Sequence, residues 1–174
     1  MKNLIIISVL ILLITAFQIP AWSQVSYELN LDNQRKMAPL FFLQGEWKGS
    51  GWMMGQDRVR QNFEQEEIIE MKLSGTILQI EGIGTAEGKV VHHALALIQP
   101  VEEEGKYEFT SFLQSGMKGT YPAQLEGGKL IWNPTDQVRY IIQINEQGQW
   151  HEIGEYNAGN AWYKFMEMTL NKIK

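Results

Sequence analysis

Turn-forming residue pairs recur at short intervals after Gly45, and they constrain the fold more than any other feature of the chain. The runs between them are rich in β-branched and aromatic residues, which favour strands. Short strands joined by tight turns about 8 to 17 residues apart are typical of an antiparallel up-and-down meander. The turn pairs are Glu87-Gly88, Glu104-Gly105, Ser115-Gly116, Gly127-Gly128, Thr135-Asp136, Gln147-Gly148 and Ala158-Gly159.

Several of these runs divide into two sets of side chains. Tyr107, Phe109, Ser111 and Leu113 form one such set, and Glu108 belongs to the opposite one. Because successive side chains of a strand point to opposite faces, this alternation places one set toward a core and the other toward water. The pattern predicts about ten strands, at approximately residues 46–54, 58–73, 76–85, 89–99, 106–114, 117–125, 129–133, 137–145, 149–156 and 161–171.

A meander of this length would expose two unpaired edges unless it closed on itself. We therefore predict an all-β fold, an antiparallel up-and-down β-barrel of about ten strands with a short N-terminal helix. A barrel of about eight strands is filled by its own side chains, so a larger one has room for a cavity. The helix is expected from Gln34 to Leu43, with Asp32 or Asn33 as its cap and a kink or division at Pro39.

The first residues have the order of a secretory signal peptide. A basic start at 1–3 precedes an almost entirely apolar segment at 4–19, and small residues stand at the cleavage positions in 21–23. An uncleaved membrane anchor is the rival interpretation, but the apolar run of about 16 residues is shorter than the ~20 that span a bilayer. We expect a signal peptide at 1–23, one mature domain at 24–174, no stable membrane insertion after cleavage, and a periplasmic or extracellular location.

Charge and cysteine content exclude several classes of partner and chemistry. The net charge is −5, and removing the signal peptide, with its one lysine, makes the mature chain more acidic. Nucleic acids and anionic membranes require clustered basic residues, so neither is an expected partner. The chain has no cysteine, which excludes disulfides, thiolate metal ligands and a cysteine nucleophile. The stability of this exported domain must therefore come from its apolar core.

The segment 40–52 contains a Gly-x-Trp-x-Gly-x-Gly pattern at Gly45, Trp47, Gly49 and Gly51. With the strand pattern at 150–170, it resembles an exported bacterial family of lipocalin-like, calycin-type β-barrels that is catalogued as a domain of unknown function. The chain is also distantly similar to nitrobindin, a ten-stranded barrel that holds haem iron through a late-strand histidine. The first resemblance implies no particular activity, and the second implies haem as a cofactor.

Six residues are candidates for contact with a ligand. Trp47 is expected to plug the barrel floor, with the two glycines after it allowing close approach of another backbone. Aromatic residues on late strands could line an apolar cavity, and an inward histidine could ligate haem or bond a polar group. His93 is expected to face inward with Leu95 and Leu97. The candidates are Trp47, His93, Tyr140, Trp150 and Tyr156, with His93 or His151 as the haem ligand if haem binds.

Other polar residues give no sign of catalytic chemistry. Glu64, Glu66 and Glu70 share an outer strand face, so the sequence does not indicate convergent carboxylates of the glycosidase type. The glycine-rich segment 82–88 ends a strand at a hairpin rather than opening a helix, which does not fit a phosphate loop. We expect no catalytic residue and no metal site. Arg139 is expected to lie outside or to pair across strands, because a buried arginine needs a charge partner.

The interpretation that these features favour is an exported, non-catalytic barrel that binds a small lipophilic ligand. Haem-linked chemistry on nitric oxide or peroxide is one alternative. The other is an envelope protein-interaction module that uses the outer barrel face, with Trp52, opposite in parity to Trp47, as its sequence support. The favoured interpretation rests on fold analogy.

Overall fold

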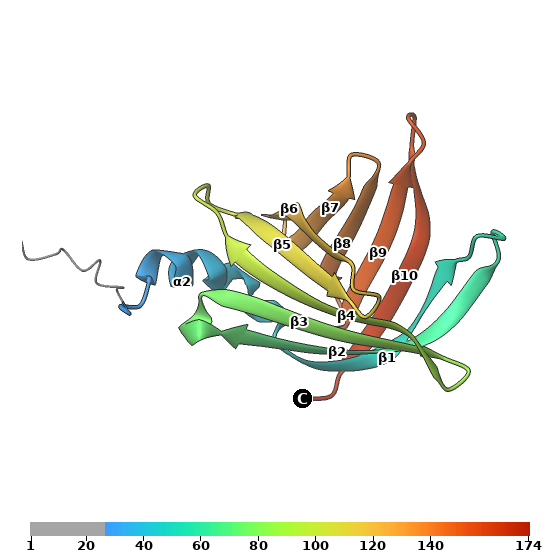
Figure 1. Ribbon diagram of the computed structural model, residues 1–174, viewed down its shortest axis with the longest axis horizontal. Helices are drawn as coiled ribbons and strands as arrows, with labels where there is room; N and C mark the ends of the chain where they lie inside the picture. Colours follow the sequence, from blue (N-terminus) through green and yellow to red (C-terminus); the bar gives the residue numbers. More distant parts are fainter. Residues whose placement is uncertain (1–26) are drawn as a thin grey trace, which may run out of the picture.

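The computed structural model describes residues 27–174, and the predicted signal peptide lies outside these residues. The chain folds into a closed antiparallel barrel in which each strand pairs with its neighbours in sequence and β1 closes against β10 (Figure 1). The strands are β1 Gly45–Met54, β2 Arg60–Lys72, β3 Ile77–Ala86, β4 Lys89–Pro100, β5 Lys106–Leu113, β6 Lys118–Glu126, β7 Lys129–Thr135, β8 Val138–Ile144, β9 Trp150–Asn157 and β10 Trp162–Lys172. The predicted all-β barrel is confirmed, with every strand boundary within two residues of the one expected.

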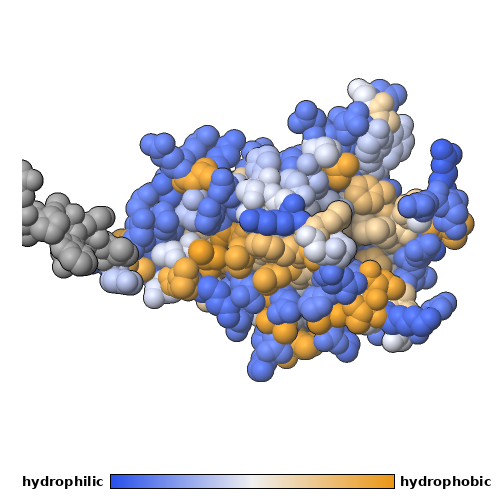
Figure 2. All heavy atoms as spheres, in the orientation of Figure 1, coloured by the Kyte–Doolittle hydropathy of each residue, from blue (hydrophilic) through white to orange (hydrophobic). Residues whose placement is uncertain are grey.

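Side-chain alternation divides each strand between an interior and an exterior face. On β2, Gln65, Glu67 and Ile69 are buried, whereas Glu64 and Glu66 are exposed. On the exterior, Arg139 pairs with Glu155 of the neighbouring strand at 2.7 Å and lies over the ring of Trp162. Figure 2 shows apolar residues gathered over the lower strands of the outer surface, flanked by hydrophilic ones. The barrel interior therefore holds the main apolar core, with a few polar groups among it.

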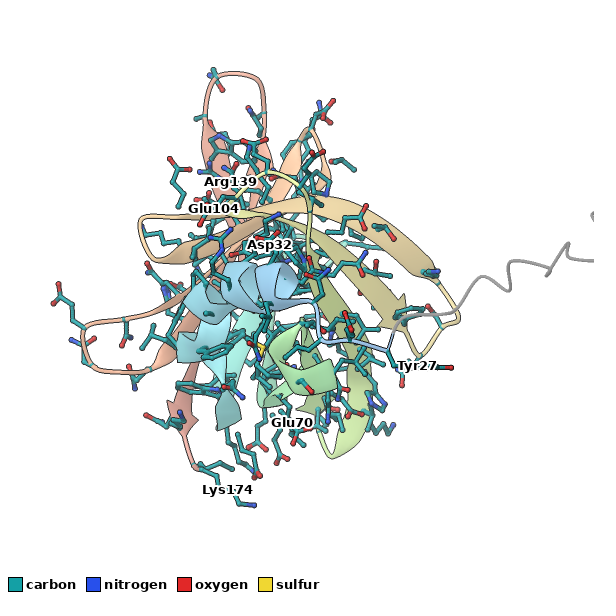
Figure 3. The ribbon with its side chains drawn as sticks, turned by 90° about the vertical axis from the view of Figure 1, so that its left-hand side faces the viewer. Tyr27, Asp32, Glu70, Glu104, Arg139 and Lys174 are labelled. Carbon is teal, nitrogen blue, oxygen red and sulfur yellow. The ribbon has the colours of Figure 1, made fainter. Side chains whose placement is uncertain are left out.

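A short helical segment covers one end of the barrel (Figure 3). It consists of the consecutive helices α2 (Leu31–Met37) and η1 (Ala38–Leu43, a 3-10 helix). A separate 3-10 turn, η2 (Leu73–Gly75), connects β2 to β3. The predicted N-cap, Asp32 or Asn33, is wrong, and the observed N-cap is Asn30. The Asn30 side chain accepts a hydrogen bond from the backbone N–H of Asn33 at 3.0 Å. The expected division at Pro39 is confirmed by the change from α to 3-10 geometry at Ala38.

Polar contacts tie this helical segment to the hairpin between β4 and β5. The Tyr107 hydroxyl donates to the backbone oxygen of Lys36 at 3.1 Å. The Lys36 ammonium in turn donates to the backbone oxygens of Val101 and Glu102. Buried Met37, Leu40 and Leu43 extend the core from the helices into the barrel end. Figure 1 shows the opposite end of the barrel without such a cover, between the splayed hairpins.

Trp47 fills the floor of the barrel beneath the helical segment. Its side chain is buried, its indole N–H donates to the backbone oxygen of Leu43 at 3.0 Å, and its ring lies 6.1 Å from that of Trp150. Gly49 then allows β1 to approach β10, because a Cβ at this position would lie 2.2 Å from the backbone oxygen of Thr169. Trp47 therefore packs in the barrel floor and Gly49 allows close backbone approach, as the sequence predicts.

The described residues contain no helix of the length and apolar content needed to cross a bilayer. Export and the periplasmic or extracellular location stay predictions, because they depend on residues 1–26.

Replacing Trp47 by alanine should reduce the free energy of unfolding by about 3–5 kcal/mol, because the change leaves a cavity at the barrel floor. Trp52→Ala is the matched control, since Trp52 lies on the outer face of the same strand beneath the guanidinium of Arg60. Trp52 is half-buried, and its cation–π contact contributes about 0.5–1 kcal/mol, so the control should cost less. Urea unfolding of both variants measures the difference, and equal losses would contradict the assigned role of Trp47.

Candidate functional site

A cavity of about 720 Å³ occupies the barrel between its helix-covered end and its open end. Several residues that line it are small, so the interior is not filled by side chains as a protein core usually is. These small residues lie on β4 and β5, and they include Ala94, Ala96 and Ser111. The cavity is therefore a product of the sequence at inward positions, rather than of strand number alone.

One wall of the cavity is a stack of aromatic rings from β5, β7 and β8. The ring of Trp132 lies between those of Phe109 and Tyr140, with centroid distances of 4.3 and 4.6 Å and nearly parallel planes. Tyr121 packs against Trp132 at an angle, and Phe165 meets the ring of Tyr140 edge-on. Such a wall offers flat apolar surface to a ligand. The buried indole N–H of Trp132 has no hydrogen-bond partner.

The interior also holds two buried glutamates, Glu67 on β2 and Glu152 on β9. One carboxyl oxygen of Glu67 accepts a hydrogen bond from the side-chain amide of Gln65 at 2.8 Å, and the other oxygen has no partner. Glu152 accepts a longer bond, at 3.3 Å, from the indole N–H of Trp150. Neither carboxyl forms an ion pair with any residue in 27–174.

Glycines on β3 make room for the polar side chains of β2. A Cβ at Gly82 would lie 2.5 Å from a carboxyl oxygen of Glu67, and one at Gly84 would lie 2.7 Å from the amide oxygen of Gln65. These glycines face Glu67 and Gln65 directly in the strand register. Gly82 and Gly84 therefore leave the space that these two polar side chains occupy inside the barrel.

Burial raises the pKa of both carboxyl groups. The pKa of Glu67 rises to about 7, because burial outweighs the hydrogen bond from Gln65. The pKa of Glu152 rises to about 8, first through burial and then through the charge of Glu67. The pKa of Tyr140 rises to about 12 through burial and the nearby Glu152. Near neutral pH the two acids therefore retain protons to a substantial degree.

The other titratable groups that line the cavity are His92, Lys118 and Tyr121. His92 is exposed and faces Gly84 of β3 in the strand register. Burial of part of the ring and the neighbouring His93 lower the pKa of His92. The Lys118 ammonium lies 5.3 Å from the ring centroid of Phe112, so it has an aromatic partner of its own.

The structure brings together some of the predicted site residues and separates others. Tyr140 and Trp150 line the cavity. Trp47 is a core residue below it, and Tyr156, 43% exposed, is absent from its lining. Trp52, on which the interaction hypothesis depended, stacks with Arg60 on the exterior. Ligand contact by any of these residues stays a prediction.

The orientation predicted for His93 is wrong. Its ring bonds to the carboxylate of Glu81 at 3.1 Å on the exterior, while His92 faces the cavity. On β4 the smaller Ala94 and Ala96 face the cavity, so the bulkier Leu95 and Leu97 share the outer face with His93.

His151 also lies on the outer face, where its Nε2 is 3.0 Å from Glu167 and its Nδ1 contacts Gln143. The two histidines named as haem ligands therefore do not fit that role, because both use ring nitrogens in exterior contacts. The described residues also contain no cluster of three or more histidine, aspartate or glutamate side chains placed to hold a metal ion.

Gln65, Glu67 and Glu152 are the site residues that the sequence reasoning missed. The signal was present in the parity of β2, because an outer face made of Glu64 and Glu66 places Gln65 and Glu67 inward. The glycines at alternate positions on the adjoining strand were a second signal for large inward side chains opposite them. Glu152 follows in the same way once Trp150 is placed inside.

No family model and no curated protein sequence matches the chain. Among solved structures, the chain is similar to the crystal structure of Rv2717c from M. tuberculosis, with a TM-score of 0.62 and 15% sequence identity. The similarity covers 80% of this chain and 98% of that one. At this level of identity it supports the barrel fold alone. The narrower resemblance to exported lipocalin-like proteins and to nitrobindin stays a prediction.

The buried acids should make the ligand-free protein less stable as pH rises. Both have folded-state pKa values above the ordinary 4.5, so their stabilising contribution is full below about pH 4.5 and is lost as pH rises through about 7 and 8. From about pH 6.5 to pH 9 we expect a loss on the order of 2 kcal/mol. The lowered pKa of His92 has an effect of the opposite sign, which acts mainly below this range.

Glu152→Gln should reduce this pH dependence, because it removes the acid with the higher pKa, whose shift comes from burial and from the charge of Glu67. Glu66→Gln is the control, since Glu66 lies on the outer face of β2 beside Lys48 and should keep the wild-type behaviour. Chemical unfolding at several pH values measures the effect. A wild-type stability that is flat or rises over this range would contradict the assigned protonation of the two acids.

Proposed function

We propose that this barrel is a non-catalytic binding protein for a small, largely apolar molecule held in its interior. The observation that carries the proposal is the cavity of about 720 Å³, which lies inside a closed barrel and is lined mainly by apolar and aromatic side chains. Ligand sites are commonly about 300–1,000 Å³, mostly apolar, with a few polar groups that orient the ligand. The size and the composition of this cavity both agree with that description.

The small inward residues support binding over a purely structural role. A core that served stability alone would fill this volume, because unfilled apolar space costs about 24 cal/mol per Å³. Ala94, Ala96 and Ser111 instead leave space open in a cavity that is also lined by the aromatic stack. A bound apolar molecule would restore the missing contacts, so ligand binding and barrel stability are expected to be linked.

The proposed setting is outside the cytoplasm, in the periplasm or the extracellular space. Its support is the signal-like order of residues 1–23. A binding protein in that setting could carry an apolar molecule through water, since the closed barrel end shields the ligand from solvent on one side.

Native mass spectrometry of the mature protein tests the proposal directly. We expect a mass excess over the bare chain that disappears on denaturation, because a cavity of this kind retains a noncovalent ligand. An excess equal to haem would contradict the proposal and favour the haem alternative. A bare-chain mass, together with no rise in melting temperature on adding apolar probes, would also overturn it.

Ala94→Trp should lower ligand occupancy at least severalfold, because the indole would occupy the cavity. Leu95→Trp is the matched control, since Leu95 is the next residue of the same strand and faces outward opposite Glu81. The control should retain wild-type occupancy in the same native mass measurement. Equal occupancy in the two variants would place the ligand outside the barrel.

A further inference from the structure

We propose that the ligand carries a protonated amine, which the carboxyl groups of Glu67 and Glu152 receive inside the cavity. This inference rests on the proposed binding function and names the chemistry of its ligand. It starts from a polar atom that the fold leaves without a partner, because one carboxyl oxygen of Glu67 is buried, borders the cavity and accepts no hydrogen bond.

The burial of these acids is unusual for a stable core. Glu67 is 6% exposed and Glu152 is 8% exposed, yet neither has a cation beside it in the described part of the chain. Buried carboxylates are normally paired, because an unpaired buried charge is strongly unfavourable. The missing partner is therefore expected to come from outside the protein.

The two acids reach the same cavity from strands that are not neighbours. β1 and β10 lie between β2, which carries Glu67, and β9, which carries Glu152. In the strand register Trp47 of β1 faces Glu67 and Met168 of β10 faces Glu152. Both acids border the same cavity, and the charge of Glu67 contributes to the raised pKa of Glu152, so the two carboxyls are close enough to interact. An ammonium group has three N–H donors, so it can bond carboxyl oxygens that approach from two sides.

The remaining charged and titratable groups do not neutralise the acids. Lys118 lies over the ring of Phe112, and His92 is on an exposed strand end with its pKa lowered. Tyr140 and Tyr121 are phenols of the aromatic wall, and the raised pKa of Tyr140 keeps it neutral. A cationic group of the ligand would therefore meet the only acidic part of a largely apolar cavity.

The same arrangement disfavours anionic ligands. A fatty acid or another carboxylate would bring a third acidic group to two acids that already hold protons, chiefly because they are buried. The stack of Phe109, Trp132 and Tyr140 suits a flat or extended apolar body attached to the amine. The ligand class is thus an amphipathic amine, rather than a fatty acid or a neutral hydrocarbon.

Three fluorescent probes with the same apolar body test the inference: pyrenemethylamine, pyrenemethanol and pyrenecarboxylate. At about pH 7 the amine should bind about tenfold more tightly than the alcohol, because its hydrogen bonds are charge-assisted. The carboxylate should bind least. Fluorescence titration of the wild-type protein gives all three affinities without relying on any variant.

Glu67→Gln and Glu152→Gln should each reduce the preference for the amine and leave the affinity for the alcohol within about twofold, because glutamine keeps the shape of the protonated acid. Glu66→Gln, on the outer face of the same strand as Glu67, is the control and should keep the wild-type preference. Melting curves establish that each variant is folded before it is titrated.

The outcomes separate the two proposals. If the alcohol and the amine bind equally, the inference about the amine is overturned while the binding function stands. Tighter binding of the carboxylate would overturn it as well. If none of the probes binds the wild-type protein, the binding function and the inference fail together.

Discussion

Closure of β1 against β10 is the interaction on which the rest of this structure depends, because it turns side-chain alternation into an inside and an outside. The pairing requires close backbone approach at Gly49, where any Cβ would collide with the backbone of Thr169. With the edges joined, every inward residue faces the same enclosed space. Trp47 and the helices then cover one end of this space (Figure 3).

The strands could be predicted well because the turns and the period-two pattern are local signals that do not depend on tertiary contacts. Which set of side chains points inward was harder to predict. On β4 both sets are apolar, and hydrophobicity alone favoured the larger leucines for the interior. A barrel with a cavity reverses this preference, since alanines inside leave the space open and leucines outside are half-buried against neighbouring strands. The wrong orientation of His93 follows directly from that reversal.

The buried acids escaped prediction for a different reason. Glutamate is rarely buried, so Glu67 next to Glu66 reads as part of a solvated acidic run. Strand parity contradicts that interpretation, and so do the glycines that face Glu67 and Gln65 across the sheet. Local rules of sequence tend to fail at functional sites, where a fold accepts an unfavourable residue for the sake of its chemistry. The inward positions at which the hydrophobic pattern fails are the same positions that supply the acidic and amide groups of the cavity.

The protonation energetics of Glu67 and Glu152 connect their unfavourable burial with the proposed binding role. In the ligand-free protein they avoid the cost of buried charge by holding protons, which is why burial raises the pKa of both. A bound ammonium would reverse the balance, because it favours the ionised carboxylates and supplies donors for the unpaired oxygen of Glu67. The group that weakens the empty barrel at neutral pH would then stabilise the occupied one. A cavity with this property discriminates by charge as well as by shape, which a purely apolar barrel of the same volume cannot do.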